Sequence, residues 1–291
     1  MMRIRTVLSA LIVALALTPM VALTNVTPVA AAERCFPETG KCVSGLFYDY
    51  WLANGGLAQQ GLPLTNEFDE PSPTNGVIYR VQYFERARFE YHPENQPPYN
   101  VLLGLLGREQ YLAKYLTKPN TEFLPPFPNF PECRFFDALL SLTPPSKVCG
   151  PFLAYWQRNG GLAQQGLPLL DAFYEVNPSD GKRYLVQYFE RARFEHHPEN
   201  KGTPYVVLLG LLGREQFLAK YPSGQAPVSV GLAPTAPYTC PDSHPIKGNK
   251  SSSGERIYHV PGGEFYDRTD PERCYATEAD AQANGYRRSQ R

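Results

Sequence analysis

The stretch Asn54-Gly-Gly-Leu-Ala-Gln-Gln-Gly-Leu-Pro-Leu64 recurs without a change at Asn159–Leu169. Two further blocks follow it in both copies: Val81–Asn95 recurs as Val186–Asn200, and Val101–Gln110 recurs as Val207–Gln216. The blocks differ at one position, where Tyr91 is replaced by His196. The spacing between copies is 105 residues, and 106 in the last block. Because such self-similarity marks repeated structural units, the body of the chain is predicted to contain two equivalent units.

Each copy has the pattern of a small α+β unit. Phe47, Tyr50 and Trp51 share one helical face, and Asn54-Gly55-Gly56 ends that helix, since Gly readily adopts the left-handed conformation after a helix. Residues 78–85 and 88–92 are rich in β-formers and predict a hairpin, residues 101–106 a further apolar strand or buried turn, and residues 107–115 a short helix. The fold class expected for the chain is therefore α+β.

The domain boundaries follow from composition. Repeat 1 is expected at 33–117 and repeat 2 at 132–221, joined by a Pro-rich linker at 118–131. Residues 222–239 are rich in Pro, Ser, Gly and Ala and carry no charge, which is typical of a flexible spacer. A small C-terminal domain is expected at 240–291, with Thr277 capping a helix that runs from Glu278 to about Asn284.

The first residues predict export. Two arginines precede an apolar run over 7–23, and Ala30-Ala31-Ala32 offers small residues at a cleavage site. This order is that of a secretory signal peptide over residues 1–32, cut after Ala32. The run is slightly short for a membrane anchor, so we expect a secreted, extracellular chain with no membrane span after cleavage and with possible attachment to the cell surface.

Six cysteines fall into three local pairs, one in each region of the chain. Six cysteines allow 15 connectivities, and an oxidising compartment favours bridges. The positions predict Cys35–Cys42, Cys133–Cys149 and Cys240–Cys274.

Charge composition narrows the class of partner. The chain has 28 basic and 28 acidic side chains, whereas nucleic-acid binders usually show a basic excess. Composition therefore argues against nucleic acid as the partner, and the sequence indicates no cofactor.

The repeats resemble the LGFP repeat of bacterial surface and cell-wall proteins, and also tandem extracellular repeats of uncharacterised secreted bacterial proteins. The matching residues are Trp51, Gly55, Gly56, Gly61, Leu62, Pro63, Gly76, Phe84 and Glu85, with Trp156, Gly160, Gly161, Gly166, Leu167, Pro168, Gly181, Phe189 and Glu190 in repeat 2. The name motif is changed at two of its four positions, because residues 60–63 are Gln-Gly-Leu-Pro. The resemblance implies surface attachment or wall binding and no activity.

The C-terminal residues resemble the sunset domain of secreted bacterial proteins, which is similar to the metal-binding domain of Ada-type repair proteins. Ile257, Pro261 and Gly285 fit that pattern, but His259, Gly263 and Ser289 stand where zinc thiolates would be. The zinc ligands of that family are therefore not retained. Cys240, His244, His259 and Cys274 remain an alternative Cys₂His₂ set.

Two kinds of candidate site residue lie in the repeats. Glu85 and Glu90, with Glu190 and Glu195 in repeat 2, are paired carboxylates of the kind used in glycoside hydrolysis. They alternate with arginines on a hairpin, which favours cross-strand ion pairs instead. Trp51, Trp156, Phe84 and Phe89 are expected in the core, and the weak surface binding candidates are Tyr48, Tyr91, His92, His196 and His197.

The expected function is non-catalytic association with the cell envelope or an extracellular polymer such as a polysaccharide. Repetition suits bivalent binding, because a second linked site raises avidity. Two alternatives stay open, namely adhesion to another surface protein and a hydrolase that acts through the paired glutamates.

Overall fold

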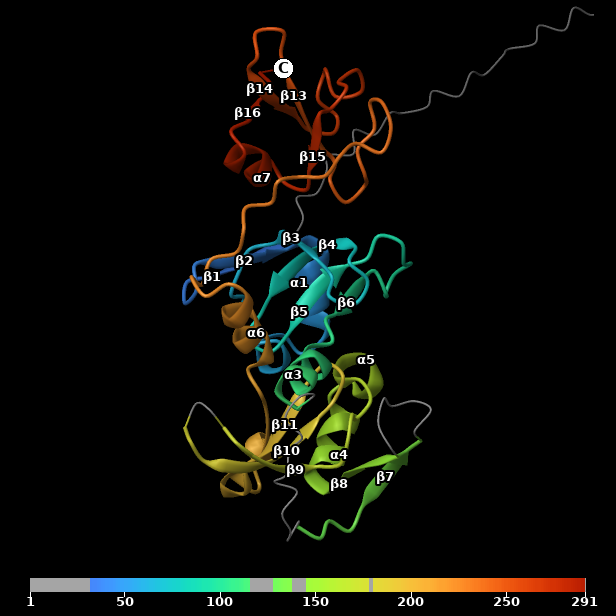
Figure 1. Cartoon of the computed structure of the whole chain (residues 1–291), viewed down its shortest axis with the longest axis vertical. Helices are drawn as coiled ribbons and strands as arrows, with labels where there is room; N and C mark the ends of the chain where they lie inside the picture. The colour runs from blue at the N-terminus through green and yellow to red at the C-terminus, as the bar shows by residue number, and fades with distance from the viewer. Residues whose placement is uncertain (1–31, 116–127, 138–144, 178–179, 291) are drawn as a thin grey trace, which may run out of the picture. The chain divides into compact units, whose positions relative to one another are not determined.

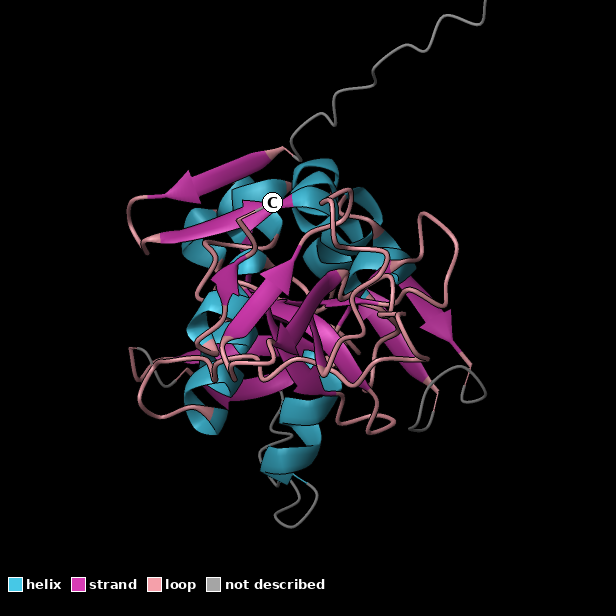
Figure 2. Cartoon of the chain, turned by 90° about the horizontal axis from the view of Figure 1, so that it is seen from above, coloured by secondary structure: helices cyan, strands magenta, loops and turns pink. Residues whose placement is uncertain are grey.

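A computed structural model describes residues 32–115, 128–137, 145–177 and 180–290. The predicted signal peptide, apart from Ala32, and most of the predicted linker at 118–131 lie outside the described residues. Helices and strands both occur in each repeat and in the C-terminal module, so the chain belongs to the α+β class (Figures 1 and 2).

Repeat 1 is built around a four-stranded antiparallel sheet of order β3-β4-β5-β6. A two-stranded hairpin, β1–β2, precedes the sheet. The elements are β1 (Glu33–Phe36), β2 (Lys41–Ser44), α1 (Gly45–Ala53), α2 (Gly56–Gln59), β3 (Phe68–Pro71), β4 (Ile78–Tyr83), β5 (Arg88–Tyr91), β6 (Val101–Leu103) and α3 (Leu106–Tyr115).

Repeat 2 has the same order of elements and the same sheet topology, β12-β11-β10-β9. Two short 3₁₀ turns are added before its last strand. The elements are β7 (Cys133–Phe136), β8 (Ser146–Cys149), α4 (Gly150–Arg158), α5 (Gly161–Gln165), β9 (Phe173–Val176), β10 (Arg183–Tyr188), β11 (Arg193–His196), η1 (Pro198–Asn200), η2 (Pro204–Val206), β12 (Val207–Leu209) and α6 (Leu212–Lys220).

The C-terminal module has a sheet of order β15-β13-β14-β16, in which β14 and β16 run parallel. Thr277 caps its helix α7 (Glu278–Ala283) through a capping box with Asp280, which confirms the predicted cap. The strands are β13 (Ile246–Lys250), β14 (Arg256–His259), β15 (Arg273–Tyr275) and β16 (Arg287–Arg288).

The repeated stretch 54–64 has a structural role. Gly55 takes a φ of 83° after α1, as the sequence predicted. The Trp51 indole N–H then donates to the carbonyl of Gly61 at 3.3 Å, and Trp156 does the same to Gly166 at 3.0 Å. The stretch therefore turns the chain back over its own tryptophan.

The three predicted disulfides are all present, as Cys35–Cys42, Cys133–Cys149 and Cys240–Cys274. Each of the first two joins facing residues of the hairpin at the start of a repeat. The sequence analysis did not predict these hairpins, because strands of only four residues are too short to show a clear alternating pattern.

Both faces of each repeat sheet are covered. Elements of the same repeat cover one face, and a helix of the other repeat covers the second face. Phe47, Trp51 and Phe89 form a core between one face of the repeat 1 sheet, helix α1 and hairpin β1–β2. The other face carries Phe68, Tyr79, Val81 and Tyr83, and these residues pack against Phe217 of α6, which belongs to repeat 2.

The reverse arrangement holds for repeat 2. There Phe173, Val186 and Tyr188 pack against Tyr111 and Tyr115 of α3, which belongs to repeat 1. The two repeats thus exchange their last helices, which we call the exchange helices (α3 and α6). The exchange helices also contact each other, since the Gln216 side chain donates to the carbonyl of Leu106 at 2.7 Å.

The order of elements within each copy is as the sequence predicted. The last helix of each copy packs against the sheet of the other copy, a point on which the sequence analysis made no prediction. Nothing in a single repeat reveals this exchange, because α3 and α6 have nearly the same sequence and would fit either sheet.

Gly107 and Gly213 permit the exchange. A Cβ on Gly107 would collide with the carbonyl oxygen of Phe189 and would lie 2.7 Å from that of Ala192. A Cβ on Gly213 would collide in the same way with Phe84 and Ala87 of repeat 1. Each exchange helix therefore starts with its backbone directly against the other repeat's hairpin turn.

We predict that Gly107→Ala lowers the free energy of unfolding by about 1–3 kcal/mol through this overlap, although Ala is the better helix former. Urea unfolding followed by circular dichroism measures the effect, with Leu112→Ala on the exposed side of the same helix as the control. Both repeats should unfold in one transition, and two separate transitions would contradict the exchange.

Candidate binding site

The aromatic residues expected in the core are there. Trp51, Trp156, Phe84 and Phe89 are all buried. Tyr48 and Tyr91, expected at the surface, are half-buried and pack against the same core as Trp51. His196, which replaces Tyr91 in repeat 2, lies edge-on to Phe130 and Phe152, and burial lowers its pKa. These three residues therefore do not form one exposed binding face.

His92 and His197 lie at equivalent positions, directly after strands β5 and β11, and each belongs to a similar cluster of side chains. His92 rests on the ring of Tyr79, and its two nitrogens lie 3.3 Å from Glu90 and 2.9 Å from Glu94. His197 rests on Tyr184 in the same way and lies 2.9 Å from Glu199. Each histidine therefore has structural partners, and the sequence had placed them only as surface candidates.

The paired glutamates have separate structural partners. Glu85 accepts the Leu62 N–H at 3.2 Å and lies 3.6 Å from Arg214 of the exchange helix α6. Glu190 accepts the Leu167 N–H at 3.0 Å. Glu90 and Glu195 instead pair with Arg88 and Arg193, each at 2.6 Å. The two carboxylates of a pair therefore contact different groups.

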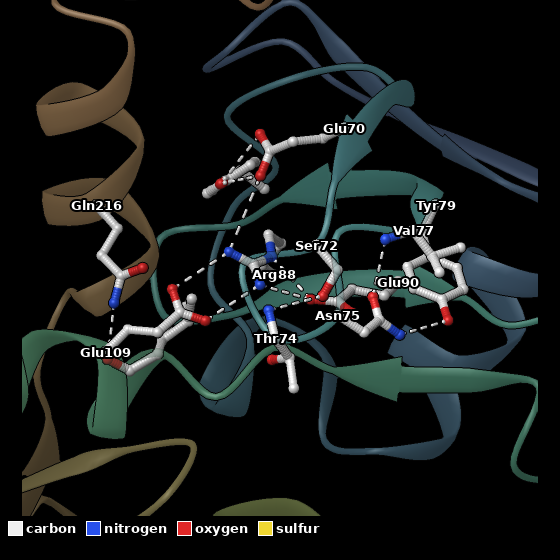
Figure 3. Close-up of polar contacts among 12 residues, drawn as sticks. Glu70, Ser72, Thr74, Asn75, Val77, Tyr79, Arg88, Glu90, Glu109 and Gln216 are labelled. Carbon is white, nitrogen blue, oxygen red and sulfur yellow. Dashed lines mark hydrogen bonds and ion pairs between the residues drawn. The ribbon is translucent and has the colours of Figure 1, made fainter.

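Arg88 and its equivalent Arg193 are buried under the exchange helices. Figure 3 shows Arg88 between Glu70, Glu90 and Glu109, at 4.0, 2.6 and 3.2 Å. Lys220 of α6 adds a contact of 2.8 Å to Glu70, which joins the two repeats. Because burying an unpaired guanidinium is costly, these carboxylates stabilise Arg88 in its buried position, and the Lys220–Glu70 contact connects this cluster to the exchange helix α6.

The alternative zinc set is not assembled. Cys240 and Cys274 form a disulfide, so neither offers a thiolate. His244 lies against Asp69 and His259 against Asn249, at 3.0 and 3.2 Å. Among the described residues, the one group of three or more with metal-ligand spacing is Glu33, Cys35 and Cys42, and its cysteines are also bridged.

A cluster of charged residues joins repeat 1 to the C-terminal module, and the sequence analysis named only one of its members, His244, as a zinc-ligand candidate. Arg80 on β4 is buried and lies 2.8 Å from Asp280 of α7, 3.4 Å from Asp69 and 3.4 Å from Glu67. His244 of the module lies 3.0 Å from Asp69. We call Arg80, Glu67, Asp69, Asp280 and His244 the Arg80 cluster.

The two carboxyls of repeat 1 in this cluster differ in environment. Burial raises the pKa of Glu67 above its ordinary value, and the opposing effects of Arg80 and Ser44 are smaller in sum. Burial also disfavours the charge on Asp69, but the hydrogen bond with His244 and the charge of Arg80 outweigh it and lower the pKa of Asp69. Asp69 therefore remains a firm anionic partner for the module.

Beside this cluster lies a hollow of about 670 Å³, which we call the repeat 1 hollow. Hairpin β1–β2, the start of β3, residues 224–229 and helix α7 form its walls. Its lining includes Glu33, Lys41, Ser44, Leu64, Thr65, Asn66, Glu67, Phe68, Arg80, Gln225, Ala226, Pro227, Val228, Ser229, Thr277, Ala279, Asp280 and Ala283. Its volume is within the range of roughly 300–1,000 Å³ that is typical of ligand pockets.

The segment predicted as a flexible spacer forms part of this wall. Residues 222–239 contain no helix or strand, as expected for such a segment. However, Leu232 exchanges two backbone hydrogen bonds with Cys274, and the carbonyl of Ser229 accepts from Asn284 at 2.6 Å. Ala226 packs against the repeat 1 core. These contacts attach the segment to both neighbours.

Repeat 2 has a smaller hollow of about 200 Å³ at the equivalent place. Ala172 and Leu185 stand there in place of Glu67 and Arg80, and Phe130 and Phe152 add apolar surface. These positions lie in the stretch 65–80, which differs from its counterpart 170–185 at 11 of 16 positions, whereas the stretch 54–64 is unchanged. Comparing the copies position by position therefore points to this stretch but does not single out Arg80.

We predict that Arg80→Leu, which copies the repeat 2 residue, loosens the module from repeat 1. The change leaves Asp69 and Asp280 without their buried cation, and breaking such a pair costs about 3–5 kcal/mol. Limited proteolysis should then cut within 222–239 at least several times faster than in the unchanged chain. Arg183→Leu on repeat 2 is the control, and an unchanged rate in Arg80→Leu would contradict the proposed link.

A second prediction concerns His92. Burial disfavours its charge, but its bonds with Glu90 and Glu94 outweigh this and raise its pKa above the ordinary 6.5. A raised folded-state pKa gives stability that is complete below about pH 6.5 and lost as the pH rises through the folded-state value. The stability difference between the unchanged chain and His92→Gln should therefore shrink from pH 6 to pH 8. Urea unfolding at each pH measures it, and a growing difference would refute the cause.

No helix among the described residues has both the length and the apolar character that crossing a membrane requires. A family model described as ArfC matches residues 225–288. No curated protein and no solved structure matches the chain. The ArfC match begins within the wall segment of the hollow and covers nearly the whole C-terminal module, so this part of the chain is similar to that family.

Proposed function

We propose that the chain is a secreted, non-catalytic binding protein that associates with the cell envelope or an extracellular polymer. The observation that carries this proposal is the repeat 1 hollow, which has the volume of a ligand pocket and a lining of both polar and apolar groups. Secretion is supported by the three disulfides, since such bonds persist in oxidising compartments.

The use of the paired glutamates supports binding over hydrolysis. Glu85 and Glu190 hold the turns at Leu62 and Leu167, and Glu90 and Glu195 neutralise buried arginines. A hydrolase needs an acid and a second carboxylate that flank one bond of the substrate. In this chain the candidate carboxylates are already occupied by the protein's own groups. The LGFP-like pattern of the repeats agrees with wall binding.

We expect the purified chain to sediment with isolated cell walls at low and moderate salt. The double variant Lys41→Ala/Gln225→Ala, which changes two side chains of the hollow, should lower the bound fraction at least threefold. Lys147→Ala in the repeat 2 hollow is the matched control and should bind as before.

Three outcomes would count against the proposal. A chain that stays in the supernatant at both salt concentrations would refute wall association. Loss of binding after protease treatment of the walls would point instead to adhesion to a surface protein. Sugar release that disappears in Glu85→Gln or Glu90→Gln would point to the hydrolase.

A further inference from the structure

The lining of the repeat 1 hollow combines two kinds of surface. The NH₂ group of Asn66 and the amide of Gln225 can form hydrogen bonds with a ligand. The hydroxyls of Ser44, Thr65 and Thr277 are already bonded to Glu67, to the backbone N–H of Tyr83 and to Asp280. Leu64, Ala226, Pro227, Val228, Ala279 and Ala283 supply apolar surface. A sugar ring matches this combination, because it carries hydroxyls at its edge and C–H groups on its faces.

The charges of the hollow do not favour a charged occupant. Its lining has two cations, Lys41 and Arg80, and three carboxylates, Glu33, Glu67 and Asp280. Arg80 is already paired with Glu67 and Asp280 and also with Asp69. Because only Lys41 and Glu33 remain and their charges balance, an anionic polymer would meet no free group of cations here.

A peptide is a poorer match for the walls. Extended peptides commonly bind by adding a strand to a sheet edge. The edge strand β2 borders the hollow, but the backbone N–H and carbonyl of Cys42 on it are already bonded to the side chains of Asn66 and Gln82. The polar groups that the lining offers are the side-chain amides of Asn66 and Gln225 and the ammonium group of Lys41. They suit a ligand whose own polar groups are spread around a ring.

The equivalent place in repeat 2 differs in size and chemistry. Its volume is less than a third of that of the repeat 1 hollow, about 200 against 670 Å³. Leu185 and Ala172 replace Arg80 and Glu67, and the partner helix α7 with segment 224–229 lies against repeat 1 alone. The doubling of the sequence therefore does not double this site.

We infer that the repeat 1 hollow binds a short segment of an uncharged polysaccharide, with one site in each chain. This inference rests on the proposed function and specifies its ligand class and its valence. It replaces the bivalent binding that sequence repetition had suggested. The C-terminal module contributes α7 to the wall, so the complete site requires repeat 1 and the module together.

Asn66 and Asp171 provide a matched pair of variants. The Asn66 side chain accepts the backbone N–H of Cys42 at 3.2 Å, and Asp171 accepts that of Lys147 at 2.8 Å. Replacing either residue by Ala removes the same kind of hairpin contact at equivalent positions of the two repeats. Only Asn66→Ala alters the repeat 1 hollow.

Isothermal titration of the full chain is the test, with a neutral trimer of N-acetylglucosamine and an anionic trimer of galacturonate as probes. We expect the neutral trimer to bind at one per chain and the anionic trimer to bind at least tenfold more weakly. Asn66→Ala should weaken the neutral trimer at least tenfold, and Asp171→Ala should leave it unchanged. Thermal melts of both variants show whether they remain folded to the same extent.

The outcomes separate this inference from the proposed function. Two sites per chain, equal or tighter binding of galacturonate, no binding of the neutral trimer at millimolar concentration, or equal losses in both variants would overturn the inference. If the chain still sediments with walls in those cases, the proposed function survives without it. If sedimentation fails too, both are refuted.

Discussion

The exchange of α3 and α6 between the repeats is the constraint on which the rest of the structure depends. Each sheet has a second apolar face that its own repeat leaves uncovered, and the other repeat's helix covers it. Burial of that face is the main favourable contribution, at about 25 cal/mol for each Å² of apolar surface. Since the exchange helices complete both cores, we expect the two repeats to fold as one unit.

Ion pairs and hydrogen bonds make this arrangement specific, in addition to the burial of apolar surface. Arg88 and Arg193 lie under the exchange helices, and each pairs with carboxylates of its own repeat. The ion pairs across the repeats come from the exchange helices, since Lys220 contacts Glu70 and Lys114 contacts Glu175. Arg193 also contacts α3, because its guanidinium donates to the side-chain carbonyl of Gln110 at 3.2 Å. A displaced helix would remove these cross-repeat partners from the buried carboxylates Glu70 and Glu175, which is unfavourable. The glutamates that the sequence offered as catalytic candidates therefore pair with buried arginines or accept backbone N–H groups.

The same pair of repeats also shows how duplication gives rise to a unique site. Where Arg80, Glu67 and Asp69 stand in repeat 1, repeat 2 has Leu185, Ala172 and Tyr174. The first set attracts Asp280 and His244 of the C-terminal module and leaves the repeat 1 hollow beside it. The second set favours a small apolar hollow under Phe130. Differences between the copies on the same framework therefore decide which repeat the module contacts.

The sequence by itself determined the local structure: the α+β class, helix α1 with its glycine end, the central hairpin, the cap at Thr277 and the three disulfides. Each depends on residues that lie close together along the chain or on the periodicity of apolar residues, so local interactions are enough to predict it. Only the tertiary structure decided which sheet each exchange helix covers and which charges meet at Arg80. The helices offer either sheet nearly the same apolar face, and Arg80 and Asp280 are 200 residues apart, so no local pattern distinguishes the arrangement that forms.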